Sequence, residues 1–130
     1  MTLLFDTQVA LWWLAGSRRL ARAMRTRIAE ARCYVSVASI WEVAIKHHLR
    51  KLPVTARRFR DEMAEAGVAI LPIQDEHAIV SDGLALDHAD PFDRLLLATA
   101  LVEGARFATA DAALIDAAAR DRALPVFAVG

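Results

Sequence analysis

Short apolar segments alternate with helical patterns along this chain of 130 residues, and this alternation most limits the folds open to it. The apolar segments have the composition and length of strands. They are Leu3–Phe5, Tyr34–Val37, Val68–Ile73, Arg106–Thr109 and Pro125–Ala128. Between and after them the sequence predicts helices at residues 18–32, 38–50, 56–66, 75–86, 92–103 and 111–122.

Strands that are separated by helices typically form a parallel sheet, because each parallel connection needs a crossover element. The Val, Ile and Leu content of these strands suits burial on both faces of the sheet. We therefore expect an α/β fold of three layers, in which helices cover both faces of a central, mostly parallel sheet of about five strands. The length allows one domain, which we assign to residues 1–130.

The composition narrows the class of protein further. Hydrophobic residues make up 56% of the chain and charged residues 25%, which is the composition of a folded domain. No apolar run reaches the ~18 residues that a membrane span needs. The first residues lack the basic region of a signal peptide, so we expect a cytoplasmic protein. The single cysteine, Cys33, excludes an internal disulfide and a cysteine-built zinc site.

The formal net charge of zero hides an uneven distribution along the chain. Residues 1–60 contain 12 Lys and Arg and 3 Asp and Glu, a net charge of +9. Residues 61–130 contain 4 Lys and Arg and 13 Asp and Glu, a net charge of −9. The basic clusters lie within residues 18–27 and 46–60, and the sequence allows two interpretations of them. They either follow a phosphate backbone or are solvated helix faces.

Acidic residues stand where the predicted strands end, and sites in open parallel sheets form beyond those ends. Asp6 directly follows the first strand, and Asp111 follows the fourth strand by two residues. Glu42 lies about one turn into the helix after the second strand. Asp90 and Asp93 lie at the start of the helix that begins around Pro91. We expect these side chains to converge at one edge of the sheet.

Each acid also has an ordinary explanation. The aspartates suit helix caps or first-turn acids. Glu42 suits an exposed ion pair with Lys46, four residues on. Its neighbours Ile40, Trp41 and Val43, however, indicate a mostly buried helix, where a carboxylate needs a partner.

A converged cluster of carboxylates requires raised pKa values or a counter-cation, because the charges repel one another. A cluster that offers only oxygen ligands suits Mg²⁺ or Mn²⁺. Such a site is suited to the hydrolysis of phosphodiester bonds by an activated water, without a covalent protein intermediate.

At these same residues the chain resembles the PIN-domain proteins, and specifically the VapC-like toxins. The segments that carry the resemblance are Leu3–Leu14, Ser36–Lys46, His88–Ala100 and Thr109–Asp111, in the order that the family shows. The resemblance implies a PIN-like fold and a Mg²⁺- or Mn²⁺-dependent endoribonuclease with RNA as substrate. It also implies a homodimer and inhibition by a small antitoxin protein encoded alongside.

The resemblance also assigns residues to roles. The catalytic and metal-binding acids that it implies are Asp6, Glu42, Asp93 and Asp111. Asp90 is then an accessory acid or a helix cap. The supporting residues, which orient carboxylates or contact the substrate phosphate, are Thr7, Ser39 and Arg94.

The histidines and tryptophans are expected to have structural roles. His47 and His48 are adjacent on a helix and diverge by ~100°, so they cannot easily face one metal ion and are expected on the helix surface. His77 and His88 are likewise expected to be structural or exposed. The tryptophans are expected in the core or a dimer interface rather than as stacking platforms for bases. They are Trp12, Trp13 and Trp41.

Other functions fit the sequence less well. The main alternative is a catalytically inactive PIN-fold module that binds RNA or a protein, but the complete set of acids disfavours it. An aspartyl phosphatase would need a second Asp where Gln8 stands, and a receiver domain would need a lysine where Thr109 and Ala110 stand. The absence of a Gly-x-Gly-x-x-Gly motif after the first strand excludes a dinucleotide-binding domain.

Overall fold

The computed structural model describes residues 1–86 and 90–130. Its five strands form one parallel sheet with the order β3-β2-β1-β4-β5. The strands are β1 Thr2–Phe5, β2 Arg32–Ser36, β3 Ala69–Leu71, β4 Arg106–Thr109 and β5 Val126–Ala128. The predicted parallel sheet of about five strands is therefore confirmed.

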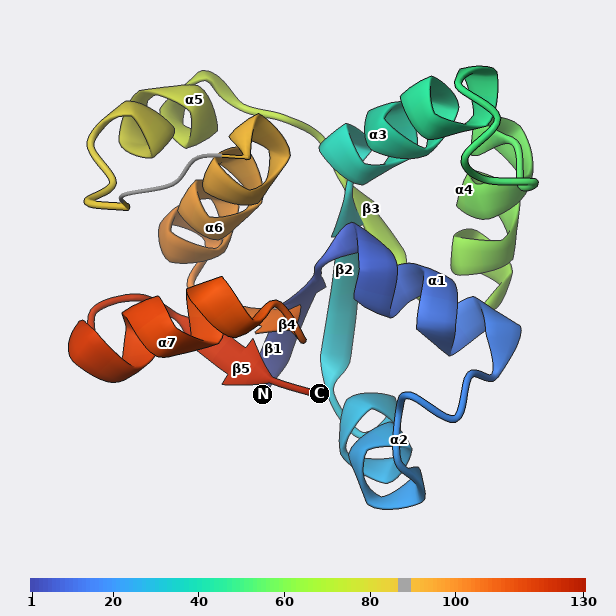
Figure 1. Cartoon of the computed structure of the whole chain (residues 1–130), viewed down its shortest axis with the longest axis horizontal. Coiled ribbons are helices and arrows are strands. Elements are labelled where there is room, and N and C mark those ends of the chain that lie inside the picture. The colour runs from blue at the N-terminus through green and yellow to red at the C-terminus, as the bar shows by residue number, and fades with distance from the viewer. Residues whose placement is uncertain (87–89) are drawn as a thin grey trace.

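Helices lie on both sides of this sheet, as predicted (Figure 1). The helices on one side are α1 Thr7–Ala15, α2 Arg22–Ala29, α3 Val37–His48 and α4 Ala56–Glu65. Those on the other side are α5 Asp75–Asp82, α6 Pro91–Glu103 and α7 Ala112–Arg120. None of the helices in residues 1–86 and 90–130 is long and apolar enough to cross a membrane.

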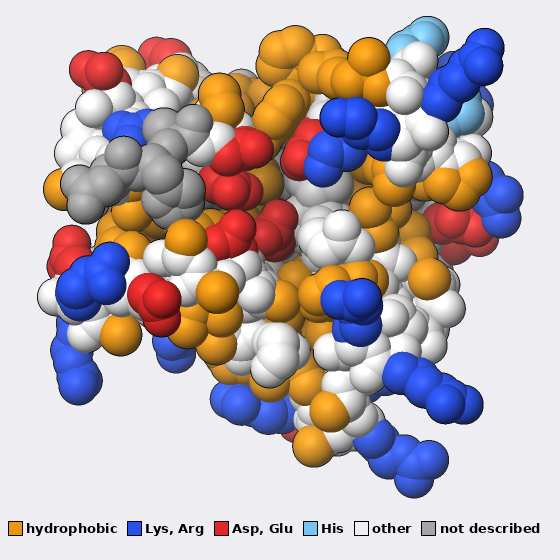
Figure 2. All heavy atoms as spheres, in the orientation of Figure 1, with side chains coloured by type: hydrophobic (Ala, Val, Ile, Leu, Met, Phe, Trp, Pro, Cys, Tyr) orange, Lys and Arg blue, Asp and Glu red, His pale blue; other side chains and the backbone are white. Residues whose placement is uncertain are grey.

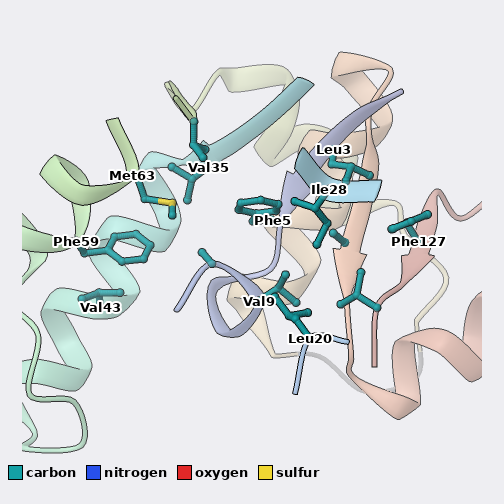
Figure 3. Close-up of a cluster of buried hydrophobic side chains, with 14 residues drawn as sticks. Leu3, Phe5, Val9, Leu20, Ile28, Val35, Val43, Phe59, Met63 and Phe127 are labelled. Carbon is teal, nitrogen blue, oxygen red and sulfur yellow. The ribbon is translucent and has the colours of Figure 1, made fainter. Parts of the chain in front are cut away.

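Each face of the sheet has its own core, because successive side chains of a strand point to opposite faces. Leu3 and Phe5 of β1 belong to one core, whereas Leu4 between them belongs to the other. The first core also receives Phe59 and Met63 from α4 (Figure 3). Helices α6 and α7 fill the second core. This two-sided burial explains why the consecutive residues Leu3, Leu4 and Phe5 of β1 are all apolar.

The strand order places a topological switch point at the centre of the sheet. From β1 the chain first adds β2 and β3 on one side and later adds β4 and β5 on the other. The carboxyl ends of β1 and β4 are therefore neighbours, and the Asp6 amide donates to the Ala108 carbonyl oxygen at 2.9 Å. Open α/β sheets bind their ligands in the crevice at this position.

Local sequence signals explain where several helices begin and end. The Ser36 hydroxyl accepts from the Ala38 amide at 2.9 Å and so caps α3. Thr55 caps α4 in the same way. Helices α1 and α6 end at Gly16 and Gly104, whose φ angles of 62° and 67° lie in the left-handed region that glycine adopts readily.

Three helices differ from the prediction. Helix α5, predicted at residues 75–86, ends earlier, at Asp82. Helix α1 was not among the predicted helices, because the apolar run Leu11–Leu14 conceals a helical period. The helix predicted at residues 18–32 is shorter and spans only Arg22–Ala29. A turn closed by Leu20 precedes it, and the Arg32 amide already pairs with the Met1 carbonyl oxygen at the start of β2.

The aromatic and histidine side chains divide into buried and exposed ones. Trp12 and Trp13 are partly buried against the first core, but Trp41 is 60% exposed, so a core position for Trp41 is wrong. His77 is buried and structural: its Nδ1 accepts from the Gln74 amide, and its Nε2 lies 3.0 Å from Glu103. The prediction for His88 lies outside the described residues.

The core assignment can be tested at Phe59, which is fully buried. We expect Phe59→Ala to lower the free energy of unfolding by about 3–5 kcal/mol, because it removes buried apolar surface and leaves a cavity. The matched control is Ile79→Ala on α5, where the side chain is 62% exposed and the expected change is within about 0.5 kcal/mol. Urea unfolding measures both, and equal midpoints for the two variants would contradict the assignment.

Candidate active site

Acidic side chains gather at the carboxyl end of the strands, as the sequence predicted. Figure 2 shows them in the middle of one face, between the half of the molecule that carries α6 and the half that carries α1 and α3. Their charges act on one another: those of Glu42 and Asp111 reach Asp6, and those of all four other acids reach Asp93. The acids brought together are Asp6, Glu42, Asp90, Asp93 and Asp111.

Asp6 occupies the N-cap position of α1, but its side chain makes no capping hydrogen bond. Instead, the Thr109 hydroxyl at the end of β4 donates to Asp6 Oδ2 at 2.6 Å, and Thr109 Oγ1 accepts from the Asp111 amide at 3.1 Å. Burial raises the pKa of Asp6, although the Thr109 hydrogen bond opposes this shift, and the Glu42 and Asp111 charges raise the pKa further. The Asp6 carboxylate is thus fixed mainly across the sheet by Thr109, although the backbone amide of Gln8 in the first turn of α1 also lowers its pKa.

Glu42 is held by partners from two helices. Thr7 Oγ1 lies 2.6 Å from Glu42 Oε1 and 2.8 Å from Ser39 Oγ. Because a hydroxyl has one proton and an ionised carboxylate only accepts, Thr7 donates to Glu42 and accepts from Ser39. The Lys46 ammonium lies 2.9 Å from Glu42 Oε2, so the i,i+4 ion pair also forms, around a carboxylate whose side chain is only 12% exposed.

Asp90 and Asp111 both cap helices, so the ordinary explanation holds for these two acids. Asp90 Oδ1 accepts from the amides of Phe92 and Asp93 at the start of α6. Asp111 Oδ1 accepts from the amides at positions 113 and 114 at the start of α7. In the described residues each cap uses only the Oδ1 oxygen, which leaves the second oxygen of each carboxylate for another ligand.

Asp93 is the least compensated acid of the cluster. The hydrogen bonds of residues 1–86 and 90–130 include none to its carboxylate oxygens. Burial is the largest cause that raises its pKa to about 7, and the charges of Asp6, Asp90, Asp111 and Glu42 add to it in that order. A carboxyl group with such a pKa marks a position where a positive charge would be stabilised.

Arg94 is placed differently from the acids. Its guanidinium donates to the carbonyl oxygens of Ser81, Leu84 and Leu86, at 2.7, 3.0 and 3.4 Å. These hydrogen bonds fasten the end of α5 and the segment after it to the first turn of α6. Arg94 therefore supports the helix that carries Asp93 and does not contact the carboxylates in the described part of the chain.

Whether the acids suit a metal ion depends on their chemistry and their spacing. The side chains offer oxygen ligands only, which Mg²⁺ and Mn²⁺ prefer. Within residues 1–86 and 90–130, no three acidic, histidine or cysteine side chains lie close enough to enclose an ion directly. Mg²⁺ usually keeps several of its waters and takes one or two carboxylates, so spaced acids whose charges repel one another fit it.

His47 and His48 do not form a metal site in the described residues. His47 Nδ1 lies 3.0 Å from the Leu52 carbonyl oxygen and so closes the turn after α3. His48 is exposed, as predicted for a helix-surface residue.

Two residues of the site were not in the predicted set. Thr109 joins Asp6 to the amide of Asp111, and Lys46 neutralises part of the charge around Glu42. Thr109 stands at the end of a strand within the Thr109–Asp111 motif, and that position is a signal for a site residue in a parallel sheet. Lys46 had been recognised only as an ordinary surface partner of Glu42.

The repulsion within the cluster can be measured through Asp93. The folded pKa of Asp93, about 7, exceeds the ordinary value of 3.8. The stability that protonation preserves is therefore complete below about pH 4 and is lost as the pH rises through 7. Asp93→Asn removes the charge at every pH. Without divalent ions we expect it to stabilise the protein by about 1–2 kcal/mol at pH 8, a value discounted because the group is partly exposed.

This gain should vanish near pH 4, and thermal unfolding over that pH range in EDTA measures it. Asp61→Asn on α4 is the matched control, since Asp61 is half exposed and pairs only with Arg60 in the described residues. A gain that is the same at pH 4 and pH 8 would show that charge repulsion is not its cause.

Comparison with known proteins identifies the family. A family model described as PIN domain matches residues 3–120. "Ribonuclease VapC22" of Mycobacterium tuberculosis is 31% identical over 118 residues, which cover 85% of this chain and 87% of that protein.

Two solved structures share the fold. The crystal structure of VapBC2 from Rickettsia felis, bound to a DNA fragment from their promoter, has a TM-score of 0.67 at 11% identity and covers all of both chains. A toxin–antitoxin complex from Klebsiella pneumoniae has a TM-score of 0.60 at 22% identity and covers 84% of this chain and 86% of its counterpart. With a matching family model over most of its length, this chain belongs to the PIN-domain family.

Proposed function

We propose that this chain is a metal-dependent endoribonuclease that hydrolyses RNA phosphodiester bonds, and that it acts as the toxin of a toxin–antitoxin pair. The observation that carries the proposal is the meeting of acids from separate segments at the switch point of the sheet. The ribonuclease relative supports RNA as the substrate class. A cytoplasmic location, where RNA is available, accompanies this proposal.

The residues proposed to hold Mg²⁺ or Mn²⁺ are Asp6, Glu42, Asp93 and Asp111, with Asp90 beside them. Such an ion supplies Lewis acidity, which stabilises the negative charge that develops on the phosphate during hydrolysis. The second oxygens of Asp90 and Asp111 remain for this purpose, because capping uses the first.

The neighbouring polar residues keep the carboxylates in place. Thr109 fixes Asp6, while Thr7 and Ser39 fix Glu42, so each carboxylate has one oxygen held by a hydroxyl. Such outer contacts orient ligands and exclude other rotamers. Lys46, which is 43% exposed beside Glu42, also presents a positive charge toward an approaching phosphate.

Removing an acid should abolish cleavage without unfolding the protein. We expect Asp6→Asn to lower the rate of RNA cleavage by at least about a hundredfold, because outer-shell changes alone lower the activity of metal sites by 10–100-fold. The assay uses purified, antitoxin-free protein and a mixed RNA pool, with Mg²⁺, Mn²⁺ or EDTA, and EDTA should stop the wild-type reaction.

The matched control is Asp61→Asn, which should cleave like the wild type because Asp61 pairs only with its neighbour Arg60 on α4 in the described residues. RNA binding without cleavage by the folded wild-type protein would instead support an inactive binding module. Cleavage that persists in Asp6→Asn would show that the site is wrongly assigned.

We also propose a homodimer and a small protein antitoxin as partners. The toxin–antitoxin complexes that share the fold support the antitoxin. An apolar groove of 460 Å³ runs between α1 and the segment that leads into α4 and offers a surface for it. Residues that line this groove include Leu11, Trp12, Ala15, Leu52 and Val54. Gln8, two residues after Asp6 in the first turn of α1, also lines this groove.

A charge placed in this groove should weaken antitoxin binding. We expect Ala15→Lys to lower the affinity for the small protein encoded alongside by about tenfold or more, because a lysine would enter an apolar contact. Ala119→Lys on α7 is the matched control, since both alanines are exposed on helices. Isothermal titration with the purified partner measures both variants. Equal affinities for the two would remove the groove from the interface.

A further inference from the structure

An aromatic pair, of which Trp41 is exposed and Phe92 is partly buried against the second core, is adjacent in sequence to two of the acids. Trp41 of α3 and Phe92 of α6 meet edge to face, with ring centroids 5.4 Å apart and planes 62° apart. Trp41 immediately precedes Glu42, and Phe92 immediately precedes Asp93, so each ring is adjacent in sequence to an acid of the site. Figure 2 shows hydrophobic side chains over the start of α3, next to the acidic centre of this face.

The exposure of Trp41 is unusual for such a large apolar side chain. Tryptophan usually buries most of its surface, yet the Trp41 side chain is 60% exposed whereas Trp12 and Trp13 are partly buried. The edge-to-face contact with Phe92 holds the indole in one orientation. Trp41, backed by the partly buried Phe92, thus presents an open aromatic surface near the site, which suits the face of a flat ligand.

Cationic residues follow Trp41 in the sequence, on α3 and in the turn after it. Lys46 is bound to Glu42 at 2.9 Å, and the exposed Arg50 and Lys51 follow at the end of the helix. Aromatic rings and cations together are the combination that binds single-stranded nucleic acid, in which bases stack on rings and phosphates meet the cations.

We propose that the Trp41–Phe92 pair stacks against an RNA base next to the phosphate that is cleaved, and so positions the substrate strand. This inference rests on the proposed ribonuclease function. Because bases in a duplex are already stacked on one another, the platform selects RNA that is unpaired at this nucleotide. Trp41 is then a positioning residue for the substrate. The RNA strand continues from it past the basic residues Arg50 and Lys51, which follow α3.

A second copy of this chain is the competing occupant of the surface. Val37, one turn before Trp41, is 38% exposed and widens the apolar area. A protein covering the rings would also remove water from the neighbouring carboxylates of Glu42 and Asp93, which is unfavourable unless it supplies matching charges. RNA brings the phosphate on which the proposed metal-dependent site acts, and the cationic residues Lys46, Arg50 and Lys51 follow Trp41 in the sequence, so we favour RNA.

The test measures binding alone, in EDTA, with a short mixed-sequence single-stranded RNA and a duplex of the same length as probes. We expect Trp41→Ala to weaken the binding of the single strand by about ten- to a hundredfold and Trp41→Tyr to retain most of it. The weaker binding of the duplex should not change. Ile79→Ala, with a side chain 62% exposed on α5, is the matched control and should bind like the wild type.

Tryptophan fluorescence reports the contact directly. The single strand should quench the wild-type emission, and most of this quenching should be absent in Trp41→Tyr. Single-strand binding by Trp41→Ala within twofold of the wild type would overturn the proposal. A fall in mass from dimer to monomer in Trp41→Ala, together with no quenching of the wild-type emission by RNA, would also overturn it. That result would assign the Trp41 ring to a contact between copies.

The RNA cleavage assay, with Asp6→Asn as its inactive reference, separates the two proposals when it is applied to the wild type and to Trp41→Ala. If the wild type cleaves RNA and Trp41→Ala cleaves the single strand equally well, the stacking proposal fails and the ribonuclease stands. If the wild type shows Trp41-dependent binding of single strands but no cleavage with any divalent ion, the ribonuclease proposal fails and the stacking contact stands.

Discussion

The hydrogen bond from the Thr109 hydroxyl to Asp6 Oδ2, 2.6 Å long, joins positions 103 residues apart. It forms where β1 and β4 end side by side, which is the point at which the strand order of the sheet reverses. The amide of Asp111 continues the connection to the start of α7. Since the acids of the N-terminal helices and those of the C-terminal helices meet across this point, the geometry of the whole cluster depends on it.

Charge at this point is only partly compensated by the protein itself. Glu42 has Thr7 and Lys46, and Asp111 has backbone amides, but Asp93 retains a pKa of about 7 because burial and neighbouring charges outweigh any compensation. A fold that gathers carboxylates in this way is less stable than the same fold without them. Such an arrangement is typical of a site that binds a cation, and it agrees with the proposed metal-dependent chemistry.

The sequence predicted elements well where burial has a regular period or a cap has a distinct chemistry. The strands of the sheet and the cap at Asp90 are of this kind. It failed for α1, because the apolar residues of this helix run consecutively and hide an amphipathic pattern. Of the two positions expected for Trp41, the core and a dimer interface, its exposure excludes the core. In both places packing against other segments decides the result.

From the sequence alone follow the α/β class, the approximate strands and the acids that end them, since each depends on residues close together in the chain. The order β3-β2-β1-β4-β5, the role of Thr109 and the exposure of Trp41 required the folded chain. The folded chain was also needed to distinguish Asp93, which has a raised pKa, from Asp90 and Asp111, which cap helices. The reason is that hydrogen bonds, burial and charge repulsion act through space, over distances that separation along the chain does not determine.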